Sequence, residues 1–328
     1  MGQIVITGGA GFIGFHLARY HAELGDKVIL LDNFFKSEGK RDDELDALLS
    51  NDNVQIFQVD LKKPIPDIEV SGSIDIVYHL AAINGTRLFY EIPYEVCRDN
   101  LLLTLNLLNW LENYETGRIL YSSSSEVYAG ADKFDLLKIP TDEHAPVIFP
   151  QPTDVRFSYG TSKFMGEFLC IHFGKKFNVP TSVIRYHNIF GPRMGSKHVI
   201  PEFALRLKER ENPFRIYGGN ETRAFCYIDD AVKATHMVAS ETKCAYEIVH
   251  IGNSKEEITI NDLAVLMMEI FGDRFELEEH GGRSSSVSRR CPDTSKLKKL
   301  TGFEAQVDLR EGLTRTMDWY LNQFKDQE

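Results

Sequence analysis

The chain has 328 residues, a formal net charge of −11 and five cysteines. This length suffices for one large domain or two medium-sized domains, and the acidic balance argues against a nucleic-acid-binding surface. No apolar run approaches the roughly 20 residues of a membrane span, and a strand pattern begins at once, which leaves no room for a signal peptide. We therefore expect a cytoplasmic protein with neither a nucleic-acid nor a membrane partner. The cysteines are odd in number and lack CxxC spacing, which predicts neither a disulfide framework nor a metal site.

The first elements are a strand and a helix joined by a glycine-rich turn. Residues 3–7 form a β-branched run typical of a buried strand, and Gly8, Gly11 and Gly14 stand where that strand must turn into a helix. Glycine lets a pyrophosphate approach the backbone closely, and the helix offers free N–H groups and the positive end of its dipole. The pattern predicts a dinucleotide site.

A second strand supports this interpretation. Residues 27–31 are apolar and end in Asp32, 18 residues beyond Gly14, where a ribose-binding carboxylate is expected. Asp32 would accept hydrogen bonds from the adenosine ribose and repel a 2′-phosphate, which favours NAD over NADP. The alternative role of Asp32 is a helix cap or turn residue.

The rest of the first half alternates strands with helices. We predict strands at 54–59, 74–80 and 118–122 and helices at 42–49, 93–114 and 159–176. Asp60 and Leu61 close one strand, where Asp60 would contact the adenine or cap a turn. Ala81 and Ala82 follow another, where small side chains let a cofactor lie close to the sheet.

This alternation predicts an α/β fold with a Rossmann-type, doubly wound parallel sheet. Residues 1–186 are the expected NAD-binding domain, which includes the catalytic residues. Residues 187–328 are less regular, with helices near 198–210, 229–240, 259–271 and 308–324. We expect them to form mainly a smaller, partly discontinuous substrate-binding lobe, with some segments returning to the first domain.

Two stretches are placed to reach a nicotinamide. Residues 121–128 (YSSSSEVY) end a strand, and Tyr159 and Lys163 lie one helical turn apart at the start of a helix. A lysine ammonium and a nicotinamide cation favour the phenolate, which makes Tyr159 a candidate proton acceptor from a substrate hydroxyl. The alternative for a YxxxK pattern is an ordinary amphipathic helix face.

Taken together, these motifs resemble the NAD-dependent epimerase/dehydratase family, the extended short-chain dehydrogenases/reductases that act on nucleotide sugars. The resemblance covers essentially the whole chain. It is carried by TGGAGFIG at 7–14, DNFF at 32–35, DL at 60–61, HLAA at 79–82, SSSSEVY at 122–128, YGTSK at 159–163, RYHNIFGPR at 185–193, TRAFCYIDD at 222–230 and RRCPD at 289–293.

The resemblance implies roles for individual residues. Tyr159 would remove the proton of the sugar 4-hydroxyl, Lys163 would hold the cofactor ribose and lower the tyrosine pKa, and Ser124 would hydrogen-bond the 4-oxygen. The residues expected at NAD are Gly8, Gly11, Phe12, Ile13, Gly14, Asp32, Asn33, Asp60, Leu61, Leu80, Ala81, Ala82, Tyr159 and Lys163. Those expected at a nucleoside-diphosphate sugar are Asn84, Thr86, Ser124, Ser125, Asn188, Arg223 and Arg290. For Asn84 and Thr86, a role in the loop turn is an equal alternative.

The fate of the 4-keto intermediate is left open by these residues. Glu126 is typical of 4,6-dehydratases and UDP-glucuronate decarboxylases, and a carboxylate there would be placed to take the C5 proton. Ser125, however, replaces the Asp of dTDP-glucose dehydratases. A 4-epimerase needs the fewest committed residues, so it is the first expectation, with dehydratase and decarboxylase as alternatives.

Two further expectations concern association and function class. A non-catalytic NAD-sensing protein would be expected to lose the Tyr159–Lys163 pair, which this chain keeps. Helices 93–114 and 159–176 resemble the pair that forms a four-helix dimer interface in the family, which predicts a homodimer.

Overall fold

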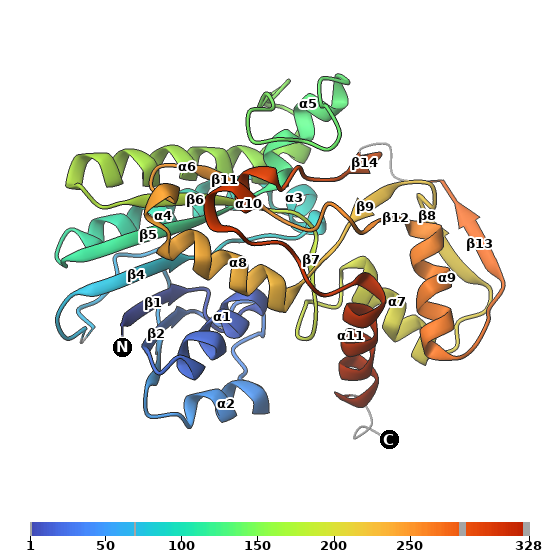
Figure 1. Ribbon diagram of the computed structural model, residues 1–328, viewed down its shortest axis with the longest axis horizontal. Helices are drawn as coiled ribbons and strands as arrows, with labels where there is room; N and C mark the ends of the chain where they lie inside the picture. The colour runs from blue at the N-terminus through green and yellow to red at the C-terminus, as the bar shows by residue number, and fades with distance from the viewer. Residues whose placement is uncertain (1, 69, 282–286, 324–328) are drawn as a thin grey trace.

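The computed structural model describes residues 2–68, 70–281 and 287–323. Its centre is a seven-stranded sheet in the order β11-β6-β5-β4-β1-β2-β3, with every neighbouring pair parallel (Figure 1). The strands are β1 (Gln3–Thr7), β2 (Lys27–Asp32), β3 (Val54–Gln58), β4 (Ile74–His79), β5 (Thr116–Ser124), β6 (Thr181–Tyr186) and β11 (Ile248–Ile251). This confirms the predicted doubly wound α/β fold.

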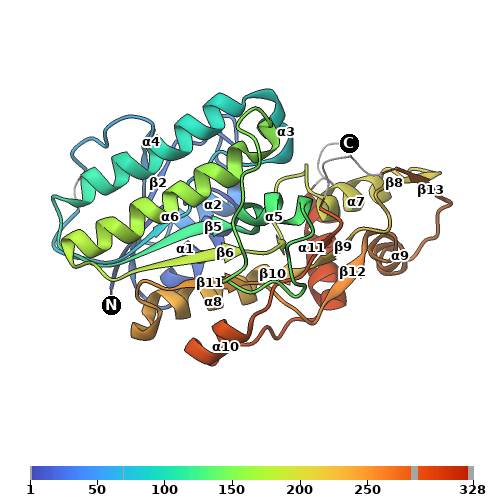
Figure 2. The same cartoon turned by 90° about the horizontal axis from the view of Figure 1, so that it is seen from above.

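Helices cover both faces of this sheet. The helices connected with it are α1 (Phe12–Glu23), α2 (Asp43–Leu49), α3 (Thr86–Glu91), α4 (Pro93–Leu111), α5 (Ala129–Lys133), α6 (Ser158–Phe177), α8 (Ile228–Ser240) and α10 (Ser295–Thr301). Figure 2 shows α4 and α6 side by side on one face, while α1 and α8 pack together on the other. The connections therefore wind around the sheet on both sides.

The apolar residues of β1 suit a strand whose two faces are both covered by helices. All five residues of β1 are buried, because side chains alternate between two covered faces. Val5 belongs to the core cluster that contains Leu107 of α4, whereas Ile4 belongs to the cluster that contains Leu17 of α1. An apolar run without alternation is the expected pattern for such a strand.

The remaining elements form a smaller lobe beside the carboxyl ends of the strands (Figure 1). Its strands are β7 (Ile189–Phe190), β8 (Phe214–Tyr217), β9 (Thr222–Ala224), β10 (Cys226–Tyr227), β12 (Glu257–Thr259), β13 (Leu277–His280) and β14 (Arg289–Arg290). Its helices are α7 (Val199–Lys208), α9 (Ile260–Phe271) and α11 (Leu309–Gln323). Three small sheets, β10-β7, β12-β9-β14 and β13-β8, hold this lobe together.

The later part of the chain also contributes to the large sheet. Strand β11 pairs with β6, and α8 packs on β5 and β6. The domain division at residue 186 stays a prediction. Sequence patterns placed the long helices correctly but missed α3, β11 and the small sheets. Two- to four-residue strands, and a helix of six residues such as α3, carry too little periodicity to detect. None of the helices within the described ranges combines the length and apolar character needed to cross a bilayer.

Candidate active site

The turn between β1 and α1 forms a cradle in which side chains would not fit. A Cβ on Gly14 would lie 2.1 Å from the carbonyl oxygen of Gly8, and one on Gly8, at φ +70°, would lie 2.9 Å from the amide nitrogen of Ala81. Helix α1 begins at Phe12 with Gly11 as its N-cap and without a side-chain cap, so its first N–H groups are left for a ligand. The cradle therefore fits a dinucleotide pyrophosphate.

Asp32 lies at the end of β2, beside this cradle. Its carboxylate accepts hydrogen bonds from the N–H groups of Ala10 at 3.0 Å and Phe34 at 2.7 Å. Burial raises the pKa of Asp32, and these hydrogen bonds oppose the increase. The backbone thus fixes the carboxylate next to the glycine turn, as a ribose-binding group requires.

The other predicted cofactor residues lie on neighbouring loops. Leu80, Ala81 and Ala82 follow β4, the strand next to β1. Asp60 accepts from the N–H of Lys62 at 3.2 Å in the turn after β3. Ile13 lies in the first turn of α1, Asn33 directly follows β2, and Leu61 follows Asp60. These residues surround the cradle, and their contacts with NAD stay predictions.

Tyr159 is buried at the start of α6, with 7% of its surface exposed. Its hydroxyl hydrogen-bonds the side chains of Ser124 and Asn84, and its ring stacks on Phe89 of α3 with centroids 4.9 Å apart. Burial and the charge of Glu126 raise the pKa of Tyr159, which the two hydrogen bonds only partly offset. In the ligand-free chain Tyr159 is therefore a neutral phenol.

Lys163 lies beneath Tyr159, one turn along α6. Its Nζ donates to the carbonyl oxygen of Ser122 at 2.7 Å and lies 5.0 Å from the ring centre of Tyr121. Burial lowers the pKa of Lys163 to about 7. Burial is the largest influence on the pKa of Tyr159, and the expectation that Lys163 lowers this pKa stays a prediction.

Glu126 is held between two arginines. Its carboxylate lies 2.5 Å from Nη1 of Arg156 and 2.8 Å from Nη2 of Arg290, and all three side chains are at most 16% exposed. Burial alone would raise the pKa of Glu126, but the two guanidinium charges outweigh this effect and hold the pKa at about 2. Glu126 is therefore a fixed anion at neutral pH and a weak base.

Sequence reasoning missed Arg156. It lies in the 3₁₀ helix Val155–Phe157, three residues before Tyr159 and next to the start of α6. An arginine in a polar loop carries no periodic signal, and only the fold shows that the loop turns toward Glu126. Its position immediately before the YxxxK motif was the one available hint.

Arg223 and Arg290 come together through strand pairing. Strand β14 is parallel to β9, and the register places Arg290 opposite Arg223. Arg223 also pairs with Glu221 at 2.9 Å. Burial and the charge of Arg290 lower the pKa of Arg223 to about 10. Neighbouring cations of this kind favour an anionic ligand such as a diphosphate.

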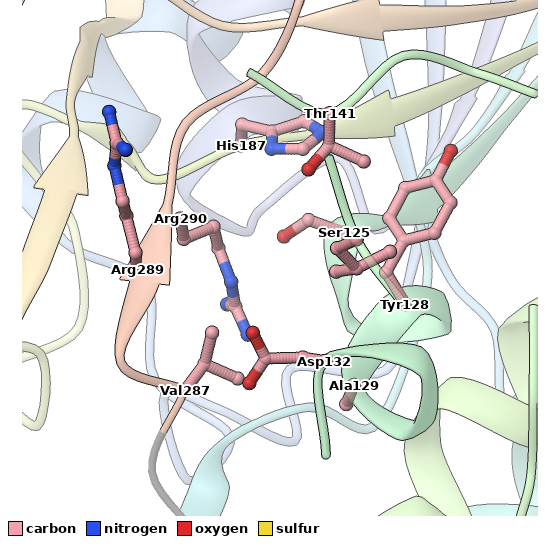
Figure 3. Close-up of a pocket in the computed structure, with 10 residues that line it drawn as sticks. Ser125, Tyr128, Ala129, Asp132, Thr141, His187, Val287, Arg289 and Arg290 are labelled. Atoms are coloured by element: carbon pink, nitrogen blue, oxygen red, sulfur yellow. The ribbon is translucent and has the colours of Figure 1, made fainter. Parts of the chain in front are cut away.

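The other predicted substrate residues, Asn188, Thr86 and Ser125, lie on three separate segments of the chain. Asn188 donates from Nδ2 to the carbonyl oxygen of Ala224 at 3.1 Å, beside Arg223. Thr86 opens α3 and is exposed, three residues before the Phe89 that stacks on Tyr159. Ser125 lines a cavity next to Glu126, shown in Figure 3. The cavity is bounded by Ser125, Tyr128, Ala129, Asp132, Leu137, Thr141, His187, Val287, Arg289 and Arg290.

A comparison with known families agrees with this geometry. Residues 4–252 match the model of the NAD dependent epimerase/dehydratase family. The chain belongs to this family. It is therefore an enzyme that uses NAD, and the cradle, Asp32 and the Tyr159–Lys163 pair lie where such chemistry requires them.

Individual relatives span nearly the whole chain. A UDP-N-acetyl-alpha-D-glucosaminuronate decarboxylase from Bacillus cytotoxicus is 32% identical, covering 97% of each chain. A UDP-glucuronate 4-epimerase from Thermodesulfobacterium geofontis is 30% identical over 97% of this chain and 96% of its own. The crystal structure of a UDP-glucuronic acid 4-epimerase from Bacillus cereus, in complex with UDP-glucuronic acid and NAD, superposes with a TM-score of 0.83. It is 26% identical and covers 98% of this chain and 100% of its own.

Proposed function

We propose that this enzyme acts on a UDP-linked uronic acid, oxidises the sugar transiently at C4 and releases CO₂ from the 4-keto intermediate. The observation that carries the proposal is the buried cluster of Glu126, Arg156 and Arg290 beside Tyr159. Two guanidinium groups flank the Glu126 carboxylate, and guanidinium groups of this kind also suit the carboxylate of a ligand. A uronic acid presents such a carboxylate at the reacting end of the substrate.

The hydroxyl network supports a role for Tyr159 in the first proton transfer. With the sugar 4-hydroxyl next to Tyr159 and Ser124, a tyrosine phenolate accepts its proton while Ser124 and Asn84 hold the oxygens in place. NAD held at the glycine cradle and Asp32 would supply the redox chemistry at C4. Burial favours the neutral phenol of Tyr159, and a positive charge beside it would favour the phenolate.

The same residues assist the loss of CO₂. A ketone at C4 makes the C6 carboxylate a β-keto acid, so the C5–C6 bond breaks and its electron pair forms an enolate across C4 and C5. Tyr159, now protonated, and Ser124 donate hydrogen bonds to the developing charge on the C4 oxygen. A proton from solvent then returns to C5.

The state of Glu126 argues against a 4,6-dehydratase. Elimination of water needs a base for the C5 proton, and a carboxylate with a pKa of about 2 is poorly suited to this step. Decarboxylation needs no such base, because the carboxylate leaves and no C5 proton has to be removed. Glu126 instead organises the two arginines.

A nucleotide-sugar 4-epimerase is the second candidate. Tyr159, Ser124 and Lys163 suffice for oxidation at C4 and return of the hydride to the other face of a rotated keto sugar. The similarity to 4-epimerases supports this candidate, including a UDP-galactose 4-epimerase structure at 29% identity and a TM-score of 0.80. Decarboxylases acting on UDP-linked uronates are 32% and 31% identical.

Product analysis distinguishes these reactions. The purified enzyme is incubated with NAD and with UDP-glucuronate, UDP-N-acetylglucosaminuronate, UDP-glucose or UDP-N-acetylglucosamine, and the products are analysed by mass spectrometry and proton NMR. We expect a loss of 44 Da, the mass of CO₂, from a uronate. An unchanged mass with a new sugar spectrum would establish 4-epimerisation, and a loss of water would establish dehydration. Turnover of the neutral sugars alone would contradict the uronate assignment.

We further propose a cytoplasmic homodimer that associates through α4 and α6. These helices pack against each other, and each carries apolar side chains on its outer face. Leu105 is 40% exposed, Met165 44% and Phe168 49%. Residues 165 and 168 are one turn apart on α6, so they form one apolar strip. A second copy of the same pair would cover it as a four-helix bundle.

A further inference from the structure

The cavity next to Glu126 contains a buried histidine whose hydrogen-bonding capacity is unused. His187 lines the cavity and is 1% exposed. Neither of its ring nitrogens has a hydrogen-bond partner among the described residues. Figure 3 shows the ring at the inner end of the cavity, beside Thr141. A buried imidazole without partners costs stability, so its presence indicates a ligand that provides one.

The residues behind His187 form a chain of hydrogen bonds, although His250 Nδ1 also has no partner among the described residues. The His250 ring lies 4.5 Å from the His187 ring, and its Nε2 accepts from the Tyr128 hydroxyl at 2.8 Å. Tyr128 in turn accepts from Arg185 at 2.5 Å, and Arg185 forms two hydrogen bonds with Glu167 at 2.7 and 2.8 Å. His187 thus packs against a hydrogen-bonded group of side chains on one side and lines the cavity on the other.

The surroundings of His187 determine which ligand group fits. Burial and the charges of His250, Arg290 and Arg185 lower the pKa of His187, which keeps its ring neutral. A neutral ring offers one N–H donor, and the Ser125 and Thr141 side chains line the same cavity. Arg290 brings a positive charge. The Asp132 carboxylate lies near the Arg290 guanidinium, on the side of the cavity away from His187 (Figure 3). Donors near a cation suit a carboxylate ligand.

The cavity is also next to the reacting carbon. Ser125 directly follows Ser124, whose hydroxyl contacts Tyr159, and Arg290 pairs with Glu126 on the same 3₁₀ turn, Ser125–Tyr128. With C4 of the sugar at Tyr159 and Ser124, the substituent on C5 is the part of the substrate that we expect at Ser125 and this cavity. The C6 carboxylate of a uronic acid is such a group.

We propose that His187 is a specificity-determining residue, which donates a hydrogen bond to the C6 carboxylate of the substrate within this cavity. The inference rests on the proposed function, because it requires a uronate at the site. The buried imidazole of His187 would distinguish a sugar with a C6 carboxylate from one with a C6 hydroxyl group. Discrimination is strong when the wrong ligand leaves a buried donor unpaired.

Binding to the NAD-loaded enzyme tests this role without requiring turnover. Because the active enzyme would convert UDP-glucuronate, dissociation constants for UDP-glucuronate and UDP-glucose are measured by calorimetry in the Tyr159→Phe variant, alone and combined with His187→Phe or His187→Asn. We expect His187→Phe to weaken UDP-glucuronate binding about 10-fold or more and UDP-glucose binding less than about 2-fold. His187→Asn, which keeps an N–H donor, should restore part of the preference. His236→Phe, at a histidine on α8 outside the cavity, is the control.

The outcomes separate this inference from the proposed function. Equal weakening of both ligands, or no weakening of either, would overturn the role of His187. Failure of the wild type to convert any uronate would overturn the proposed function, whatever the variants bind. If thermal melting shows that His187→Phe does not fold, His187→Asn decides: a smaller preference for the uronate supports the role of His187, and an unchanged preference overturns it.

Discussion

Tyr159 combines an unfavourable pKa with a favourable position. Its burial against Phe89 and its proximity to Glu126 keep the phenol protonated, whereas Ser124 and Asn84 hold the oxygen in the orientation needed for proton transfer. If Tyr159 is the base, as proposed, a cation bound beside it would favour its phenolate. Cofactor binding and ionisation of Tyr159 would then be coupled.

Replacing Tyr159 by Phe should remove this function selectively. The phenyl ring preserves the stacking on Phe89, so we expect a normal fold and normal NAD content but a decrease in kcat of about 10²- to 10⁴-fold. Turnover of the preferred substrate and the amount of bound NAD are the measurements. Tyr94→Phe, at a tyrosine that is 67% exposed on α4, is the matched control. Unaltered turnover in the Tyr159 variant would remove this residue from the mechanism.

The two arginines around Glu126 predict a pH dependence of stability. The pKa of Glu126 is about 2 in the folded chain and 4.5 ordinarily. Its ionised form therefore stabilises the fold above pH 4.5, and this contribution is lost as the pH falls toward 2. The shift corresponds to roughly 3 kcal/mol. Glu126→Gln should lower the free energy of unfolding at pH 7, and the difference from the wild type should shrink with acidification.

Urea unfolding at a series of pH values measures this difference. Glu112→Gln, at an exposed carboxylate after the end of α4, is the control and should follow the wild type throughout. A difference that stays constant between pH 7 and pH 3 would show that the ion pairs with Arg156 and Arg290 contribute nothing through ionisation.

The individual site residues differ in how far a sequence reveals them. Tyr159 and Lys163 are separated by one helical turn, and Gly8, Gly11 and Gly14 mark a strand-to-helix turn, so local spacing suffices. Arg156 and His187 acquire their significance from tertiary contacts. Their partners, Glu126 and the cavity wall, come from distant parts of the chain, and no local pattern encodes such a contact.

Among the elements, α4 and α6 have two separate tasks. Their inner faces cover the sheet and place Tyr159 and Lys163, while their outer faces remain apolar. Long amphipathic helices could be located from periodicity alone. Whether the outer strip is covered depends on a second chain, which periodicity within one chain does not reveal.

Charged residues in this strip should prevent association. The double variant Leu105→Glu/Phe168→Glu places two negative charges on a face that a dimer would bury, so we expect a monomer at micromolar concentration. Light scattering coupled to size-exclusion chromatography measures the mass. Val265→Glu, at an apolar residue of α9 that is 42% exposed, is the control and should stay dimeric. A wild type that is itself monomeric would contradict the proposal.

At the scale of the whole molecule, the large sheet followed from the alternation of strands and helices. The helices of the smaller lobe were also expected, but its short strands and their pairing were not. Strand β14 has two residues and aligns with β9 only in the folded chain. A two-residue strand carries no hydrophobic period, so Arg290 could be assigned by family resemblance but not placed by pattern. The site is thus predictable where one strand or helix builds it, and unpredictable where several distant segments meet.

The pairing of β14 with β9 has a consequence for the order in which the enzyme is made. The glycine cradle, Glu126 and Tyr159 leave the ribosome well before residue 290, which is the second of the two arginines around Glu126. A nascent chain that has already folded its sheet would hold a carboxylate with half of its ion pairs missing. Fragments that stop before residue 289 therefore leave Glu126 with Arg156 as its one arginine partner among the two described here.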